Sequence, residues 1–148
     1  MTKNERNYME MTFPSNEDNV IFAGYVVRAF ATQLGATIDE LSDINTVVRE
    51  AVTNVIAHAY PDTVGKVSVR ATIFDDNVIE IKVRDWGCGI ENVEKARQPL
   101  FSTAVDRTGM GFTIMDSFMD SVKVRSKPEK GTTVTMRRRI SAKKIGQK

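Results

Sequence analysis

The sequence predicts an α+β fold, a two-layer α/β sandwich in which helices pack on one face of a mainly antiparallel sheet. Apolar residues recur at helical spacing in residues 20–34 and 41–59, and they alternate with polar residues in 66–84 and 121–138. Within each alternating region, a short polar turn separates two stretches, as in an antiparallel hairpin. Helices in one set and an antiparallel sheet in another favour two packed layers.

The chain begins with a predicted strand and a predicted helix. Residues 9–13 alternate in a way that suits a short strand, and Ser15–Asp18 then offers an N-cap. The apolar stripe of the first helix ends at Gly35, a residue typical of a helix C-terminus. Residues 112–119 show helical spacing again and predict a further helix late in the chain.

The second helix has the clearest boundaries and carries a row of polar residues. It begins with Thr37-Ile-Asp-Glu40, a capping-box pattern, and it must end before Pro61. Glu50, Asn54 and His58 follow one another at intervals of four, so they lie on one stripe beside the apolar face. Around a phosphate, such a carboxylate accepts a proton and such an amide oxygen ligates Mg²⁺. By spacing alone, the row is also typical of a solvated helix face.

In the second half of the chain, apolar residues recur at every second position. The predicted strands are residues 66–74, 78–84, 121–125 and 132–138. Asp75-Asp-Asn77 joins the first pair, and Lys127-Pro-Glu-Lys-Gly131 joins the second pair. Both connections are short, so we expect each pair to be antiparallel.

Composition indicates one globular domain. The chain has 148 residues, of which 41% are hydrophobic and 27% charged, and we expect residues 1–148 to form a single domain with a basic, flexible tail at about 141–148. The net charge is +2, but six cations and no acid lie after residue 136, so residues 1–136 carry −4. A folded body with a net negative charge is not typical of a nucleic-acid binder. The tail is then the only candidate for contact with a polyanion.

Several functional classes are excluded at this stage. The longest nearly apolar stretch, residues 20–27, is too short to span a membrane, and the polar start does not resemble a secretory signal. We therefore expect a soluble, cytoplasmic protein. Cys88 and His58 are the only residues of their kinds, so an intrachain disulfide or a His-rich metal centre is not expected. Any metal ion is therefore expected to enter the protein together with a bound ligand.

Two glycine-containing segments are compatible with phosphate or nucleotide binding. Asp85-Trp-Gly-Cys-Gly89 directly follows a predicted strand, and its glycines suit a sharp bend or a close approach of backbone to a ligand. Thr108-Gly-Met-Gly-Phe112 opens a predicted helix, where free backbone amides can receive phosphate oxygens. Residues 98–107 lack either period and suit a mobile cover or a plain surface loop. Each segment alone is weak evidence, and the Walker pattern is absent.

Taken together, these motifs resemble a known family. Glu50-Ala-Val-Thr-Asn54 with His58, Asp85-x-Gly-x-Gly89, Thr108-Gly-Met-Gly-Phe112 and Gly131-Thr-Thr133 occur in the order and spacing of the ATP-binding superfamily of histidine kinases, gyrase and mismatch-repair ATPases. Within it, residues 8–140 resemble the small anti-sigma-factor serine kinases, especially the sporulation members. The resemblance implies a Bergerat-type ATP-binding fold.

The resemblance also implies roles for individual residues. Glu50 matches the catalytic glutamate that activates a serine hydroxyl, and Asn54 matches the ligand of an Mg²⁺ ion that bridges the ATP phosphates. Asp85 matches the aspartate that reads adenine, and Arg107 is placed to contact the γ-phosphate as a catalytic residue. The implied nucleotide-binding positions are Asn54, His58, Asp85, Gly87, Gly89, Thr108, Gly109, Met110, Gly111, Phe112 and Thr133.

The expected function follows from that family. Its members are homodimers that hold an RNA polymerase sigma factor and phosphorylate an anti-sigma-factor antagonist on serine, without direct contact to nucleic acid or membrane. The apolar stripe with Phe22, Val26 and Phe30 suits dimerisation, and it suits an ordinary core equally well. Three alternatives remain open: a sigma-binding module that uses ATP without catalysis, a general-stress anti-sigma kinase, and a histidine-kinase catalytic fragment.

Overall fold

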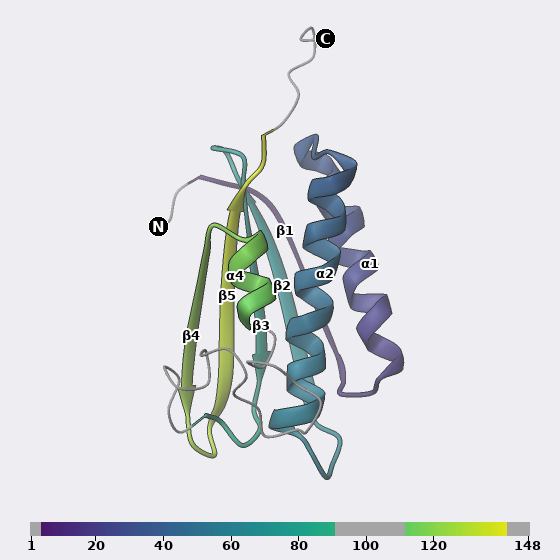
Figure 1. Ribbon diagram of the computed structural model, residues 1–148, viewed down its shortest axis with the longest axis vertical. Coiled ribbons are helices and arrows are strands. Elements are labelled where there is room, and N and C mark those ends of the chain that lie inside the picture. The colour runs from purple at the N-terminus through teal and green to yellow at the C-terminus, as the bar shows by residue number, and fades with distance from the viewer. Residues whose placement is uncertain (1–3, 91–111, 142–148) are drawn as a thin grey trace, which may run out of the picture.

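A five-stranded sheet forms one layer of the structure, a computed structural model that describes residues 4–90 and 112–141. The strands lie in the order β1-β2-β3-β5-β4, and every neighbouring pair is antiparallel (Figure 1). Their bounds are β1 (Glu5–Pro14), β2 (Lys66–Phe74), β3 (Val78–Asp85), β4 (Ser121–Lys127) and β5 (Gly131–Arg139). The first strand is longer than predicted, because its pairing with β2 extends to Glu5.

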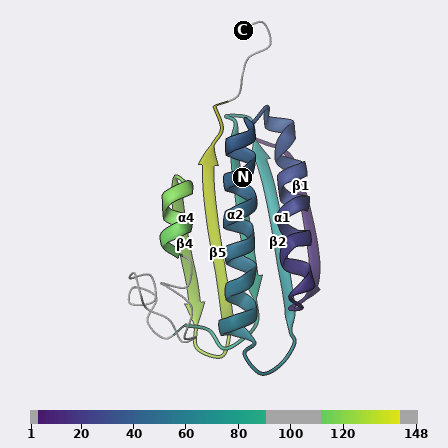
Figure 2. The same ribbon diagram turned by 45° about the vertical axis from the view of Figure 1, so that its right-hand side comes forward.

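Helices form the second layer. Figures 1 and 2 show α1, α2 and α4 on the same face of the sheet, with α2 between the other two. The helical elements are α1 (Asp18–Ala31), η1 (Thr32–Leu34), α2 (Ile38–Asn54), η2 (Val55–Ala59) and α4 (Phe112–Phe118). The predicted α+β sandwich is therefore confirmed, and the opposite face of the sheet has no helix over it among the described residues.

The hydrophobic core fills the space between the layers. Alternate residues of the central strands, such as Val69, Ile81 and Met136, point towards the helices and are fully buried. They meet the apolar stripe of α2, where Val48 and Val52 are also fully buried. Because α2 packs over the centre of the sheet, its polar edge is held at a fixed position relative to the strand ends. Within the described residues, no helix is long and apolar enough to cross a membrane.

The capping box at the start of α2 is present. Thr37 Oγ1 accepts a hydrogen bond from the Glu40 amide at 3.1 Å, and a Glu40 carboxylate oxygen accepts one from the Thr37 amide at 2.9 Å. The other Glu40 oxygen accepts bonds from the amide and hydroxyl of Ser141. Burial acts to raise the pKa of Glu40, but these hydrogen bonds and nearby Arg138 hold that pKa below its ordinary value. Glu40 thus ties the start of α2 to the end of β5.

Substitution of Thr37 by alanine tests the importance of this cap. We expect Thr37→Ala to lower the free energy of unfolding by about 1 kcal/mol, because the Glu40 amide loses its side-chain acceptor. Urea unfolding followed by circular dichroism measures the change. Thr113→Ala, at an exposed helical position, is the matched control and should change the free energy by less than about 0.5 kcal/mol. Equal effects of the two substitutions would contradict the prediction.

Candidate functional site

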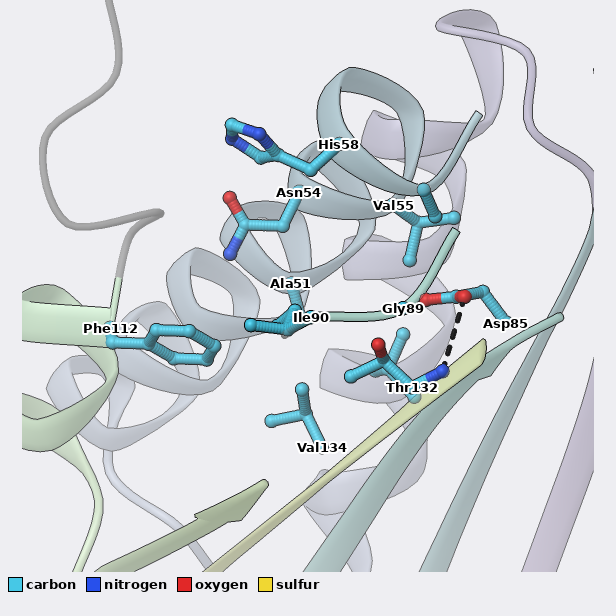
Figure 3. A pocket seen from close by; sticks show the side chains of 12 residues that line it. Ala51, Asn54, Val55, His58, Asp85, Gly89, Ile90, Phe112, Thr132 and Val134 are labelled. Carbon is cyan, nitrogen blue, oxygen red and sulfur yellow. Dashed lines mark hydrogen bonds between the residues drawn. The ribbon is translucent and has the colours of Figure 1, made fainter. Parts of the chain in front are cut away.

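A cavity lies where the C-terminal end of α2 approaches the ends of β3 and β5 (Figure 3). Its volume is about 30 Å³, which is room for one or two water molecules. Its walls are mostly apolar, with a few polar groups among them. The lining residues are Ala51, Asn54, Val55, His58, Ala59, Val83, Asp85, Gly89, Ile90, Phe112, Thr132 and Val134.

The helix supplies one wall of this cavity. Asn54 is 8% exposed and His58 is half-buried, and Figure 3 shows both side chains projecting to the same side of the helix. Glu50 is half-buried one turn before Asn54 and lies outside the set of lining residues. The structure therefore places two of the three predicted residues on the wall, and the third, Glu50, one helical turn before Asn54.

The last turn of this helix differs from the prediction. Residues Val55–Ala59 form a π-helical turn, in which the Tyr60 amide donates to the Val55 carbonyl oxygen at 3.1 Å. The sequence predicted regular α-helix to about residue 59. A π-turn contains an additional residue, so it changes the direction in which His58 projects relative to Asn54. Such turns are frequent at functional sites.

Asp85 forms the opposite wall and is 4% exposed. Within the described part of the chain, both hydrogen bonds to its carboxylate go to Oδ1, from the Gly87 amide at 2.9 Å and the Thr132 amide at 3.2 Å. Oδ2 is thus left as an acceptor for a ligand. Burial raises the pKa of Asp85 above its ordinary value, and the two amides oppose that rise only in part.

The segment after Asp85 is held in place by contacts that the sequence did not indicate. The Tyr60 hydroxyl accepts from the Trp86 amide at 2.8 Å and donates to the Lys66 carbonyl oxygen at 2.9 Å. Burial raises the pKa of this hydroxyl, so it keeps the proton that it donates. The Ser126 hydroxyl accepts from the Ile90 amide at 2.7 Å. Trp86 is 26 residues from Tyr60, and Ser126 is 36 residues from Ile90, so no local motif could have identified these two contacts.

The predicted glycines make close contact with the chain itself. A Cβ at Gly87 would lie 2.3 Å from the Ala59 carbonyl oxygen, and one at Gly89 would lie 2.0 Å from that of Lys127. Gly89 also has φ of +77°, a backbone conformation that favours glycine. Both residues therefore allow this segment to pack between the end of the helix and the β4–β5 turn. Of the two, only Gly89 lines the cavity.

We expect Gly89→Ala to destabilise the fold by about 2–3 kcal/mol. The substitution combines a positive φ with a collision against a backbone oxygen that is itself part of a turn. Gly35→Ala is the matched control, because Gly35 has a similar φ of 71° at an exposed position. That control should cost about 1 kcal/mol. Urea unfolding compares the two variants, and an equal loss in both would contradict the predicted collision.

The threonine that lines the cavity is Thr132, and the prediction of Thr133 is wrong in this respect. Thr133 lies on the opposite face of the sheet, among residues that the helices do not cover. Successive side chains of a strand point to opposite faces, so a difference of one residue exchanges the two sides. Thr132 also contacts Ser126, with 2.7 Å between their hydroxyl oxygens. In the sequence, two adjacent threonines gave no signal of which one faces inward.

Several predicted residues lie outside the described part of the chain. They are Arg107, Thr108, Gly109, Met110 and Gly111. The basic tail, apart from Ser141, also lies outside it. Phe112 is described, is 1% exposed, and lines the cavity at the start of α4. The described site thus brings together Asn54, His58, Asp85, Gly89 and Phe112.

The fold and this site define a class of protein. A family model described as "Histidine kinase-like ATPase domain" matches residues 13–138. The histidine kinase domain of a blue-light-activated kinase from Erythrobacter litoralis has a similar fold, with a TM-score of 0.57 and 20% identity over 80% of this chain and 61% of that chain. A Mycobacterium tuberculosis structure of RsbU and RsbW domains gives a TM-score of 0.59 and 20% identity over 91% of this chain and 32% of that chain. These likenesses concern the fold alone.

Relatives that match over nearly their whole length identify the family more specifically. A protein from Caldanaerobacter subterraneus named "Anti-sigma F factor" is 54% identical over 90% of this chain and 94% of its own length. Another of the same name, from Geobacillus thermodenitrificans, is 46% identical over 94% of this chain and 97% of its own length. The chain therefore belongs to the anti-sigma F factor family, with a histidine kinase-like ATPase domain.

Proposed function

We propose that the protein is an anti-sigma factor and an ATP-dependent serine kinase of the cytoplasm. It sequesters an RNA polymerase sigma factor, sporulation sigma F, and phosphorylates the anti-sigma-factor antagonist on serine. One observation carries the proposal: a buried carboxylate, Asp85, and a buried amide side chain, Asn54, line one cavity of an ATPase domain. The names of the relatives support the choice of sigma factor.

In this proposal the adenine base enters beside Asp85. Its amino group donates to Oδ2, while Oδ1 stays bonded to the Gly87 and Thr132 amides. The cavity is too small for a purine in the described arrangement. Ile90 and Phe112 line the side of the cavity away from Asp85, and binding requires that wall to move outward (Figure 3).

The phosphates extend from the base towards α2. No group of three His, Cys, Asp or Glu side chains able to hold a metal occurs in residues 4–90 and 112–141. Asn54 in the cavity wall offers a side-chain amide oxygen, a ligand type that suits Mg²⁺ carried by the phosphates. When bound, the ion neutralises charge on the phosphates. We assign the remaining phosphate contacts to the amides of Gly109 and Gly111 and to Arg107, with His58 at the edge of the nucleotide site.

Glu50 is the proposed general base. Its carboxylate takes the proton of the substrate serine hydroxyl as the serine oxygen attacks the γ-phosphorus. A new bond forms between that oxygen and phosphorus, the bond from the γ-phosphorus to the bridging oxygen breaks, and ADP leaves. The position of Glu50, one helical turn from the proposed metal ligand Asn54, supports this assignment.

The outer surface of α1 supports a homodimer. Ile21, Phe22 and Tyr25 are 52%, 52% and 58% exposed, whereas Val26 and Phe30 are half-buried. Three large apolar side chains within two helical turns form a patch that a second copy can cover. We propose this patch as the dimer contact. Of the stripe predicted from sequence, only Phe22 belongs to it.

One experiment tests the whole proposal. The purified protein is mixed with sigma F and the antagonist from the same organism, with γ-labelled ATP and Mg²⁺. We expect sigma F to be retained in the presence of ATP, and the label to appear on the antagonist as an acid-stable phosphoserine. Retention of sigma F without label would favour the non-catalytic module. Acid-labile label would favour a histidine kinase, and no retention would contradict the sigma-binding role.

A further inference from the structure

The face of the sheet opposite the helices is strongly basic. Figures 1 and 2 show the helices on one side of the sheet only, and a hollow of about 1060 Å³ lies on the other side. We call this surface the basic sheet face. Its residues are Glu10, Thr12, Lys66, Ser68, Arg70, Glu80, Lys82, Arg84, Trp86, Ser121, Lys123, Arg125, Thr133, Thr135 and Arg137. Seven of these are cations and two are acids.

The strand register brings these cations side by side across neighbouring strands, from β2 to the edge strand β4. Arg70 of β2 lies directly opposite Lys82 of β3. In the neighbouring row, Arg84 and Arg125 both lie opposite Thr133 of β5, one from each side. Like charges directly opposite one another destabilise a sheet. The repulsion between Arg70 and Lys82 is therefore unfavourable for the isolated fold, and a negatively charged ligand bound over this pair would relieve it.

Internal acids neutralise only part of the face. Glu80 accepts a hydrogen bond from Arg137 at 2.7 Å, and its other oxygen lies 4.0 Å from the Lys82 ammonium. Glu10 lies 3.9 Å from Arg70. Within residues 4–90 and 112–141, no carboxylate is paired with Arg84, Lys123 or Arg125. Those three cations form an unneutralised group on β3 and β4.

Hydroxyl groups lie between the cations and add hydrogen-bond donors. Ser68 lies opposite Arg84, and Thr135 lies between Lys82 and Lys123 in the register. Carboxylates bind well to such a mixture, because guanidinium groups form paired hydrogen bonds and hydroxyl groups complete the set. We propose that the basic sheet face binds an acidic segment, rich in aspartate and glutamate, of a protein partner.

Two features favour an acidic polypeptide over a nucleic acid. The ring of Trp86 already has Lys66 and Arg84 over it, at 4.2 and 4.6 Å from its centroid, and Arg70 lies 4.2 Å from that of Tyr8. These cations therefore compete with bases for the aromatic surface on which bases stack. The face also includes the carboxylates of Glu10 and Glu80, which accept hydrogen bonds from the backbone amides of a polypeptide, whereas a phosphodiester backbone has no such donor.

A second copy of the chain does not fit this face. A two-fold symmetric contact would place the same seven cations against each other. The surface is also distinct from the cavity, because the sheet separates them, with Thr132 on the inner side and Thr133 on the outer side. The basic sheet face is therefore a candidate for contact with a polyanion in addition to the tail, since seven cations of the body lie together on it.

Trp86 provides the test, because it is the only tryptophan in the chain and lies on this face. The full chain is titrated with poly-L-glutamate of about 20 residues at low salt, and tryptophan emission is recorded. We expect a saturable change whose affinity falls at least tenfold when the salt concentration rises to about 0.3 M. The double variant Lys82→Glu with Arg125→Glu should bind at least tenfold more weakly. Neither of these residues contacts the Trp86 ring.

The matched control is Arg28→Glu with Arg49→Glu, which changes the net charge equally on the helices. This control should keep the parental affinity within about twofold at the same salt. Equal weakening in both double variants would overturn the proposal, because binding would then depend on net charge or on the tail. A thymidine oligonucleotide of the same length that binds more tightly, and is lost in the Lys82 and Arg125 variant, would overturn it in favour of nucleic acid. Thermal unfolding verifies that each variant is folded, and Lys123→Glu alone serves if the double variant is not.

Discussion

Glu50→Gln lowers the rate of phosphoryl transfer to the antagonist by about 100- to 10,000-fold, the range that general-base catalysis contributes. The amide has the same shape as the carboxylate but cannot accept the serine proton. ATP affinity should change by less than about threefold, because Glu50 lies outside the lining of the cavity in which the base is proposed to bind. Transfer of label from γ-labelled ATP measures the rate, and calorimetric titration measures the affinity.

A control variant distinguishes the specific role of Glu50 from the general effect of removing one negative charge. Glu5→Gln removes one carboxylate at the exposed start of β1, far along the chain from the site, and should leave both quantities unchanged. Equal rates for the parent and Glu50→Gln would exclude Glu50 as the base. A loss of ATP binding in parallel with the rate would instead assign Glu50 to nucleotide binding.

Asp85→Asn lowers the affinity for ATP and ADP by about 10- to 100-fold, the loss expected for one hydrogen bond to a charged group. The asparagine oxygen can still accept from the Gly87 and Thr132 amides, so the local backbone is retained. Its amide nitrogen then occupies the place of Oδ2 and presents a donor to the donor of adenine. Calorimetric titration with and without Mg²⁺ measures the loss, and unchanged affinity would remove Asp85 from the adenine site.

The same substitution also removes a pH dependence from the stability of the protein without nucleotide. Because burial raises the pKa of Asp85 above its ordinary value of 3.8, the folded chain binds this proton more tightly than the unfolded chain. Ionisation therefore reduces stability as the pH rises from 3.8 through the raised pKa, and ATP affinity increases over the same interval. Asp85→Asn should abolish both dependences. A parent protein with ATP affinity independent of pH in this interval would contradict the assigned role of the ionised carboxylate.

Local signals in the sequence were sufficient for most of the fold. The capping box at Thr37 and Glu40 and the turn at Asp75–Asn77 depend on neighbouring residues, and the structure confirms both. Asn77 even adopts φ of 68°, as expected for an asparagine that completes a tight turn. The periods of two and 3.6 also persisted over whole elements, so the two layers could be predicted.

What the sequence did not predict depends on contacts between distant segments. The π-turn before Tyr60 coincides with the bonds that the Tyr60 hydroxyl makes to Lys66, at the start of β2, and to Trp86, directly after β3. The choice between Thr132 and Thr133 depends on the register of β5 against β3. No pattern within a short window specifies a register between strands more than 40 residues apart.

The basic sheet face was missed for a related reason. Its cations are distributed over four strands, from Lys66 to Arg137, and most of them alternate with apolar residues. Along the chain they read as the polar half of ordinary strands. Only the assembled sheet brings them together, so the net charge of the body concealed a strongly positive surface.

Asp85 and Trp86 are consecutive residues, yet the first lines the cavity and the second lies on the far side of the sheet. Their shared peptide group is fixed by the bond from the Trp86 amide to the Tyr60 hydroxyl. A ligand that moves the indole therefore acts on the backbone that carries this carboxylate. If the proposed acidic segment does so, thermodynamic reciprocity requires that it and the nucleotide alter each other's dissociation constants by the same factor.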